Sequence, residues 1–62
     1  MERMQVVRVD GDFVTLRGED GELCNRRIAR GHRFHVGEEV DVEVKELRGW
    51  NVATPIRSEE AD

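Results

Sequence analysis

The segment VDVEVKEL, residues 40–47, alternates apolar residues with charged ones, and this pattern restricts the fold more than any other part of the chain. A period of two puts Val40, Val42 and Val44 on one side of an extended chain and their charged neighbours on the other. Apolar residues elsewhere also alternate, whereas an amphipathic helix needs them every three or four positions. The chain is therefore predicted to be all-β.

Glycine-containing turns divide the chain into short strands. Asp10-Gly11 and Asp20-Gly21 suit hairpin turns with positive φ, and Arg48-Gly49 suits a turn before the last strand. The predicted strands are residues 4–10, 12–17, 22–28, 39–46 and 50–56. Residues 29–38 are the longest connection and are predicted to form a long loop or a short helical turn.

Five short strands with one long link favour a closed small barrel. The chain has 62 residues, near the lower size at which a domain folds unaided, and closure removes strand edges that a small sheet cannot otherwise protect. A long link between the third and fourth strands favours an oligonucleotide/oligosaccharide-binding (OB) fold over a Src-homology-type barrel, whose longest loops come earlier. We expect one domain over residues 1–57 and a flexible acidic tail over residues 58–62.

The predicted core follows from the same alternation. Its expected members are Val7, Val9, Val14, Leu16, Leu23, Ile28, Val36, Val40, Val42, Val44, Trp50 and Val52, with Leu47 and Ile56 at the margin. Trp50 is the largest apolar side chain available, and we expect it to plug the barrel rather than to stack on a base. Phe34 is expected to anchor the long link, and Cys24 to be a small apolar residue in a strand.

Positive charge is concentrated in the middle of an acidic chain. The formal net charge is −4, with ten basic and fourteen acidic residues. Residues 24–37 contain four arginines and no acidic residue, so this segment carries +4 and the remainder −8. Such a segment can hold phosphate locally, although a solvated loop with a chance run of arginines would have the same composition.

Composition argues against several classes of protein. A single cysteine excludes an internal disulfide, and with no signal-like segment and no apolar run near the roughly 20 residues that span a membrane, a cytoplasmic protein without membrane contact is expected. Cys24, His32 and His35 fall one ligand short of a structural zinc site, so neither a metal nor a cofactor is expected. No nucleophile motif or phosphate loop occurs, which argues against an enzyme.

The order of three features is similar to that of a known family. The acidic-Gly turn EDGEL is followed by Ile28 with the basic link ARGHRFHV, and then by the strand GEEVDVEV. Over about residues 5–56 this order resembles bacterial translation initiation factor one, a small OB-fold protein, and the last two predicted strands are similar to those of cold-shock domains. The resemblance implies an RNA-binding barrel associated with translation or transcription. The chain lacks the aromatic cluster of cold-shock domains and has an acidic C-terminal end.

Basic residues and one aromatic residue are the candidates for a binding surface. If Val14 and Leu16 face inward, the period of two sends Phe13 and Arg17 outward, beside Arg8 of the first strand, whereas the opposite register would bury Phe13. Arginines in the link are suited to phosphate because each can donate two parallel hydrogen bonds. The predicted nucleic-acid-binding residues are Arg8, Phe13, Arg17, Arg26, Arg27, Arg30, His32, Arg33 and His35.

The expected ligand is single-stranded RNA or DNA, bound through phosphates with one or two stacked bases, in association with the ribosome or RNA polymerase. Two alternatives stay open. The acidic surface would equally suit docking on a basic partner such as RNA polymerase or a ribosomal protein, and an open barrel edge would suit a structural subunit that oligomerises. The sequence does not predict the oligomeric state.

Overall fold

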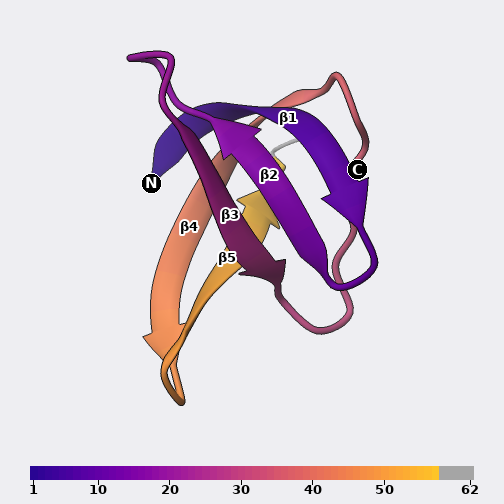
Figure 1. The fold of residues 1–62 in the computed structure, drawn as a ribbon, viewed down its shortest axis with the longest axis vertical. Coiled ribbons are helices and arrows are strands. Elements are labelled where there is room, and N and C mark those ends of the chain that lie inside the picture. Colours follow the sequence, from indigo (N-terminus) through magenta and orange to yellow (C-terminus); the bar gives the residue numbers. More distant parts are fainter. Residues whose placement is uncertain (58–62) are drawn as a thin grey trace.

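The computed structural model describes residues 1–57 and contains five strands (Figure 1). The predicted acidic tail, residues 58–62, lies outside the described residues. The strands are β1 (Glu2–Asp10), β2 (Phe13–Arg17), β3 (Leu23–Ile28), β4 (Glu39–Leu47) and β5 (Trp50–Ile56). These bounds agree with the predicted strands to within two residues.

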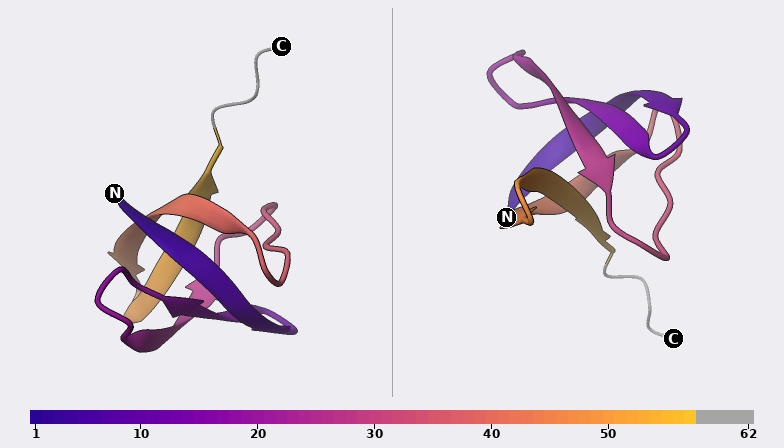
Figure 2. Two further views of the ribbon diagram at one scale, coloured as in Figure 1. Left: turned by 90° about the horizontal axis from the view of Figure 1, so that it is seen from above. Right: turned by 60° about the horizontal axis from the view of Figure 1, so that its bottom comes forward.

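The strands close into a barrel in the order β1-β2-β3-β5-β4, with β4 pairing back to β1 (Figures 1 and 2). Neighbours are antiparallel except β3 and β5, which run parallel through Arg27↔Val52 and Ile28↔Ala53. This closed five-stranded order is OB-like and confirms the predicted all-β class. The link 29–38 is a loop with two turns, and residues 1–57 contain no helix.

The core is small and lies inside the barrel. Its buried members are Met4, Val6, Val14, Leu16, Phe34, Val40, Val42 and Ala53, with Val9, Cys24 and Ile28 packed against them. Phe34 is 5% exposed and anchors the link, as predicted. Because the link contributes an aromatic side chain to the interior, the path of residues 29–38 is fixed by apolar packing.

A β-bulge changes which residues of β1 face inward. The register with β2 shifts between Val6 and Arg8, and Val7 is the extra residue. Met4 and Val6 are buried, whereas Val7 is half-buried and absent from the core. The prediction that Val7 faces the core was therefore wrong, because a bulge breaks the period of two on which it rested.

The residues of β5 that face the interior are the alternate set to the one predicted. Ala53 and Pro55 are buried, whereas Trp50 is 49% exposed and Val52 is half-buried. Ala53 lies where β5 meets β3 in parallel, and a small side chain fits the narrow interior of a five-stranded barrel. Trp50 therefore does not plug the barrel, and the prediction of a core role for it was wrong.

Several other predicted core residues are also exposed. They are Leu23, Val36 and Val44, together with the marginal residues Leu47 and Ile56. Leu23 pairs with Arg17 on the outer face, and Val44 lies beyond Val42, where the pairing of β4 with β1 ends. The free end of the β4–β5 hairpin therefore extends past the body of the barrel.

Three connections gather at one end of the molecule. In Figure 1 the β1–β2 turn, the start of the link and the β4–β5 turn all lie toward the bottom. The β4–β5 turn is tight, with positive φ at both Arg48 (55°) and Gly49 (84°). Such a two-residue turn matches the twist of a hairpin and fixes the strand ends beside it.

Candidate nucleic-acid interface

Residues from three strands form the centre of the candidate interface. Phe13 of β2 pairs with Arg27 of β3, and Arg27 pairs with Val52 of β5. These residues occupy the outer face, because Val14, next to Phe13, is buried inside. Trp50 lies two residues before Val52 and shares that face. Barrel closure thus brings together residues that are far apart in the sequence.

The two aromatic rings and the guanidinium group form one cluster. The ring centroids of Phe13 and Trp50 are 5.8 Å apart and the ring planes are tilted by 52°. Arg27 Cζ lies 5.6 Å from the Phe13 centroid and 5.0 Å from the Trp50 centroid, within the range of cation–π attraction. Both rings remain accessible, with Phe13 40% and Trp50 49% exposed. The cluster is therefore a solvent-facing platform.

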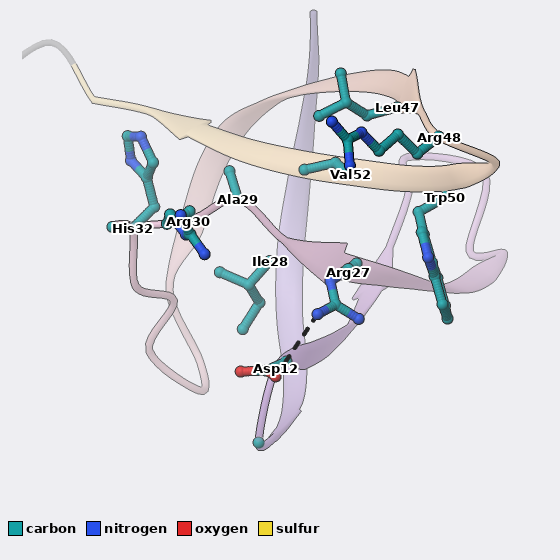
Figure 3. A pocket seen from close by; sticks show the side chains of 12 residues that line it. Asp12, Arg27, Ile28, Ala29, Arg30, His32, Leu47, Arg48, Trp50 and Val52 are labelled. Atoms are coloured by element: carbon teal, nitrogen blue, oxygen red, sulfur yellow. Dashed lines mark ion pairs between the residues drawn. The ribbon is translucent and has the colours of Figure 1, made fainter.

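An open groove lies beside this platform. It is bordered by the β1–β2 turn, the end of β3 with the start of the link, and the β4–β5 turn. Its charged and polar side chains are Asp12, Arg27, Arg30, His32 and Arg48. Figure 3 shows Arg30 and His32 on one side of Ile28, and Arg27 with Trp50 on the other. The aromatic platform and the basic side chains of the groove thus form a single surface.

Arg27 of this surface and Arg8 of β1 contact aspartates at the β1–β2 hairpin, where Asp10 ends β1 and Asp12 lies in the turn. Arg27 Nη2 lies 3.9 Å from Asp12 Oδ2, drawn as a dashed line in Figure 3. Arg8, which faces outward opposite Thr15, has its Nη2 3.7 Å from Asp10 Oδ2. Both contacts are long and lie at the surface, where the side chain of Arg8 is 72% and that of Arg27 is 39% exposed, so the carboxylates can be displaced at little cost.

Arg17 faces outward as predicted but lies away from the groove. Its Nη1 donates a hydrogen bond to Gln5 Oε1 at 3.3 Å. It borders a second hollow together with Arg3, Glu19 and Glu39. In that hollow two carboxylates accompany two guanidinium groups, so it lacks the positive balance of the groove.

Arg26 lies on the inward-facing side of β3, because it pairs with Val14, which is buried inside the barrel. Its Nη1 donates to the backbone carbonyl of Asn25 at 2.9 Å. Its Nε is buried and has no hydrogen-bond partner within residues 1–57. The side chain therefore points away from the platform that its neighbour Arg27 helps to form.

Arg33 and His35 are exposed but do not border the groove. They flank Phe34, whose burial directs this part of the link to the barrel. The backbone carbonyl of Arg33 accepts a hydrogen bond of 2.8 Å from Arg57. Of the nine predicted site residues, the structure brings together Arg27, Arg30 and His32 at the groove, with Phe13 and Arg8 beside them.

The predicted site residues do not include Leu47, Arg48 and Trp50, which also border this surface. A signal for them exists. A two-residue turn at Arg48-Gly49 requires Leu47 and Trp50 to pair, so both must lie on the same face of the hairpin. Whether that face is outward depends on which alternate residues of β5 point into the barrel. The alternation of β5 predicted that Trp50 and Val52 point inward, whereas Ala53 and Pro55 do.

Within residues 1–57 there is no group of three or more His, Cys, Asp or Glu side chains placed to hold a metal ion. Nor does that part of the chain contain a helix of the length and apolarity needed to cross a membrane. Comparison of the chain with protein-family models, curated proteins and solved structures finds no match.

Proposed function

We propose that this protein binds single-stranded nucleic acid, RNA in particular, across the platform and groove. The observation that carries the proposal is the exposed Phe13–Arg27–Trp50 cluster at the edge of a basic groove. On an OB-like barrel the face of the second and third strands, with the β1–β2 and β4–β5 loops, is a common site for oligonucleotides. The resemblance to initiation factor one favours RNA as the ligand, in a process associated with translation or transcription.

Base stacking on the platform would supply the sequence-independent part of the affinity. Every base has a flat face, and stacking on an aromatic side chain contributes about 1–3 kcal/mol per base. The ring centroids of Phe13 and Trp50 are 5.8 Å apart, so the two rings are in contact and leave no space for a base between them. Bases would therefore stack on the exposed faces of the rings, and little discrimination among bases is expected.

Phosphate binding would come from the groove. Three arginines and one aspartate line it, which gives it a positive balance in a chain with net charge −4. Arginine donates paired hydrogen bonds to phosphate oxygens. The acidic remainder of the molecule weakens long-range attraction to polyanions, so binding should depend on contact at the groove.

The test is a fluorescence titration with a labelled single-stranded RNA of about eight nucleotides. Trp50 emission and ligand anisotropy are followed between about 50 mM and 200 mM salt. Binding of the wild-type protein should weaken steeply with salt. The variant R27A/R48A should bind at least about tenfold more weakly, with the slope of log K against log salt reduced by roughly 0.7 to 1.4, because each lost phosphate contact lowers it by up to about 0.7.

The variant R3A/R17A is the matched control, because it removes the same charge from the second hollow. It should retain the wild-type salt slope. An equal loss of RNA affinity in R27A/R48A and R3A/R17A would show that binding does not use the groove. Absence of binding by the wild-type protein at low salt, to RNA and to DNA of the same length, would overturn the proposal and favour a protein partner.

A further inference from the structure

The β1–β2 turn places two carboxylates against two arginines of the interface. Asp10 and Asp12 flank Gly11, whose φ of 61° fits a tight turn. The contacts are Arg8 to Asp10 at 3.7 Å and Arg27 to Asp12 at 3.9 Å. Each of these two arginines therefore has an acidic neighbour at the tip of the β1–β2 hairpin.

Each carboxylate lies where a phosphate bound by the same arginine would lie. An aspartate oxygen near a guanidinium group is chemically similar to a phosphate oxygen, since both are anionic acceptors. Asp10 pairs with Phe13 across the hairpin, so its side chain is on the platform side of the sheet. Asp12 borders the groove. A strand that stacks a base on Phe13 would bring its own phosphates to the same two arginines.

The contacts are weak enough to be displaced. The side chains of Asp10 and Asp12 are 76% and 77% exposed, and that of Arg8 is 72% exposed. Exposed ion pairs at such distances contribute little to stability. They still oppose binding, because an arriving phosphate must replace a carboxylate and then lie next to it.

We propose that Asp10 and Asp12 are internal competitors for phosphate that set the affinity of the interface. This inference rests on the proposed binding of single-stranded nucleic acid and adds the residues that limit it. In the free protein they neutralise Arg8 and Arg27. When a strand binds, the two carboxylates are released to solvent and take up cations, which offsets part of the counterion release from the ligand. The result is a weaker complex with a shallower salt dependence.

The test compares wild-type protein with D10N/D12N in the titration with RNA of about eight nucleotides. Asparagine keeps the size of each side chain and is well suited to turns, so the fold should be retained, which circular dichroism checks. We expect affinity to rise about tenfold at low salt, a few-fold for each displaced ion pair. The salt slope should steepen by up to roughly 1.4, because both arginines then contribute fully.

The matched control is E19Q/E22Q, which removes the same negative charge from the β2–β3 connection at the other end of the barrel. This control separates local competition from a change of net charge. If D10N/D12N binds no tighter and no more steeply with salt than E19Q/E22Q, the competitor role is overturned while nucleic-acid binding stands. If neither the wild type nor D10N/D12N binds RNA or DNA, the proposed function itself fails. Binding by D10N/D12N alone would support the competitor role.

Discussion

Trp50 shows how the environment of one residue separates a core role from an interface role. It is the only tryptophan in the sequence, and burial would have made it the largest contributor to the core. Instead it begins β5 on the outer face, 49% exposed and in contact with Phe13 and Arg27. Together with Phe13 it forms an exposed aromatic surface beside a basic groove, which supports the proposed ligand binding.

Replacement of Trp50 by alanine should therefore affect binding far more than folding. We expect RNA affinity to fall at least about fivefold, the lower limit for loss of a stacked base. The free energy of unfolding should change by less than about 1 kcal/mol, because half of the ring is already in solvent. Urea unfolding followed by circular dichroism and RNA anisotropy measure the two effects. Val36→Ala, an exposed apolar residue away from the groove, should change neither, and a major loss of stability in Trp50→Ala would assign the ring to the core after all.

The link 29–38 is an element without regular structure that is nonetheless held at both ends. Near its start, Ala29 donates a backbone hydrogen bond to Ala53 at 2.9 Å, and in its middle Phe34 is buried. At its end Arg57 Nη2 lies 2.7 Å from Glu38 Oε2 and 2.8 Å from the Arg33 carbonyl oxygen. These contacts fix the start of the link, and so the position of Arg30 and His32 at the groove.

Arg57→Ala should loosen this element. The ion pair with Glu38 is the shortest in residues 1–57, and its side chains are 33% and 20% exposed. We expect the free energy of unfolding to fall by about 1–2 kcal/mol, between the contribution of an exposed ion pair and that of a hydrogen bond to a charged group. Arg3→Ala is the control, because its 3.5 Å contact with Asp41 is more exposed and its loss should cost less. Equal urea midpoints for the two variants would contradict a special role for Arg57.

The sequence predicted all five strands and the inward faces of β2 and β4, but not the inward faces of β1 and β5. Alternation and glycine turns located all five strands, because both signals depend on neighbouring residues alone. The inward face of β1 depends on a bulge at Val7, and that of β5 on how closely it approaches β3 at Ala53. Both are set by barrel closure, between residues distant in the chain. The candidate site was therefore found in part: Arg27, Arg30, His32 and Phe13 come from local signals, whereas Trp50 and Arg48 need the closed barrel.

At the scale of the whole molecule, the candidate interface runs across the strands rather than along them. The row of paired residues runs from Phe13 on β2 through Arg27 on β3 to Val52 on β5. It continues past the groove to Lys45 on β4, which pairs with Val52. Neighbouring strands are about 4.8 Å apart, so this row is about 14 Å long. At a rise of roughly 3.4 Å per nucleotide along a stacked strand, it would cover about four nucleotides, the lower end of the range for OB folds.

Affinity should accordingly depend on ligand length up to that limit. RNAs from about two to about twelve nucleotides, measured by the same anisotropy titration, should bind with steeply rising affinity up to about four nucleotides and only slightly more tightly beyond it. The barrel offers no further row of aromatic and basic side chains among its described residues to extend the contact. A steady gain per nucleotide through the whole series would indicate a longer path over the surface.

The parallel contact between β3 and β5 has a consequence for motion. Its register covers Arg27↔Val52 and Ile28↔Ala53, whereas β4 and β5 pair from Asp41↔Ile56 to Leu47↔Trp50. Because fewer backbone hydrogen bonds join β3 to β5, local opening of the barrel should occur most easily at this seam between the two strands. Amide protons at the seam should therefore exchange with deuterium before those of β2. Since Arg27 and Trp50 sit on opposite sides of the seam, each such opening changes the spacing of the platform, so the rings can adjust to a base without unfolding of the core.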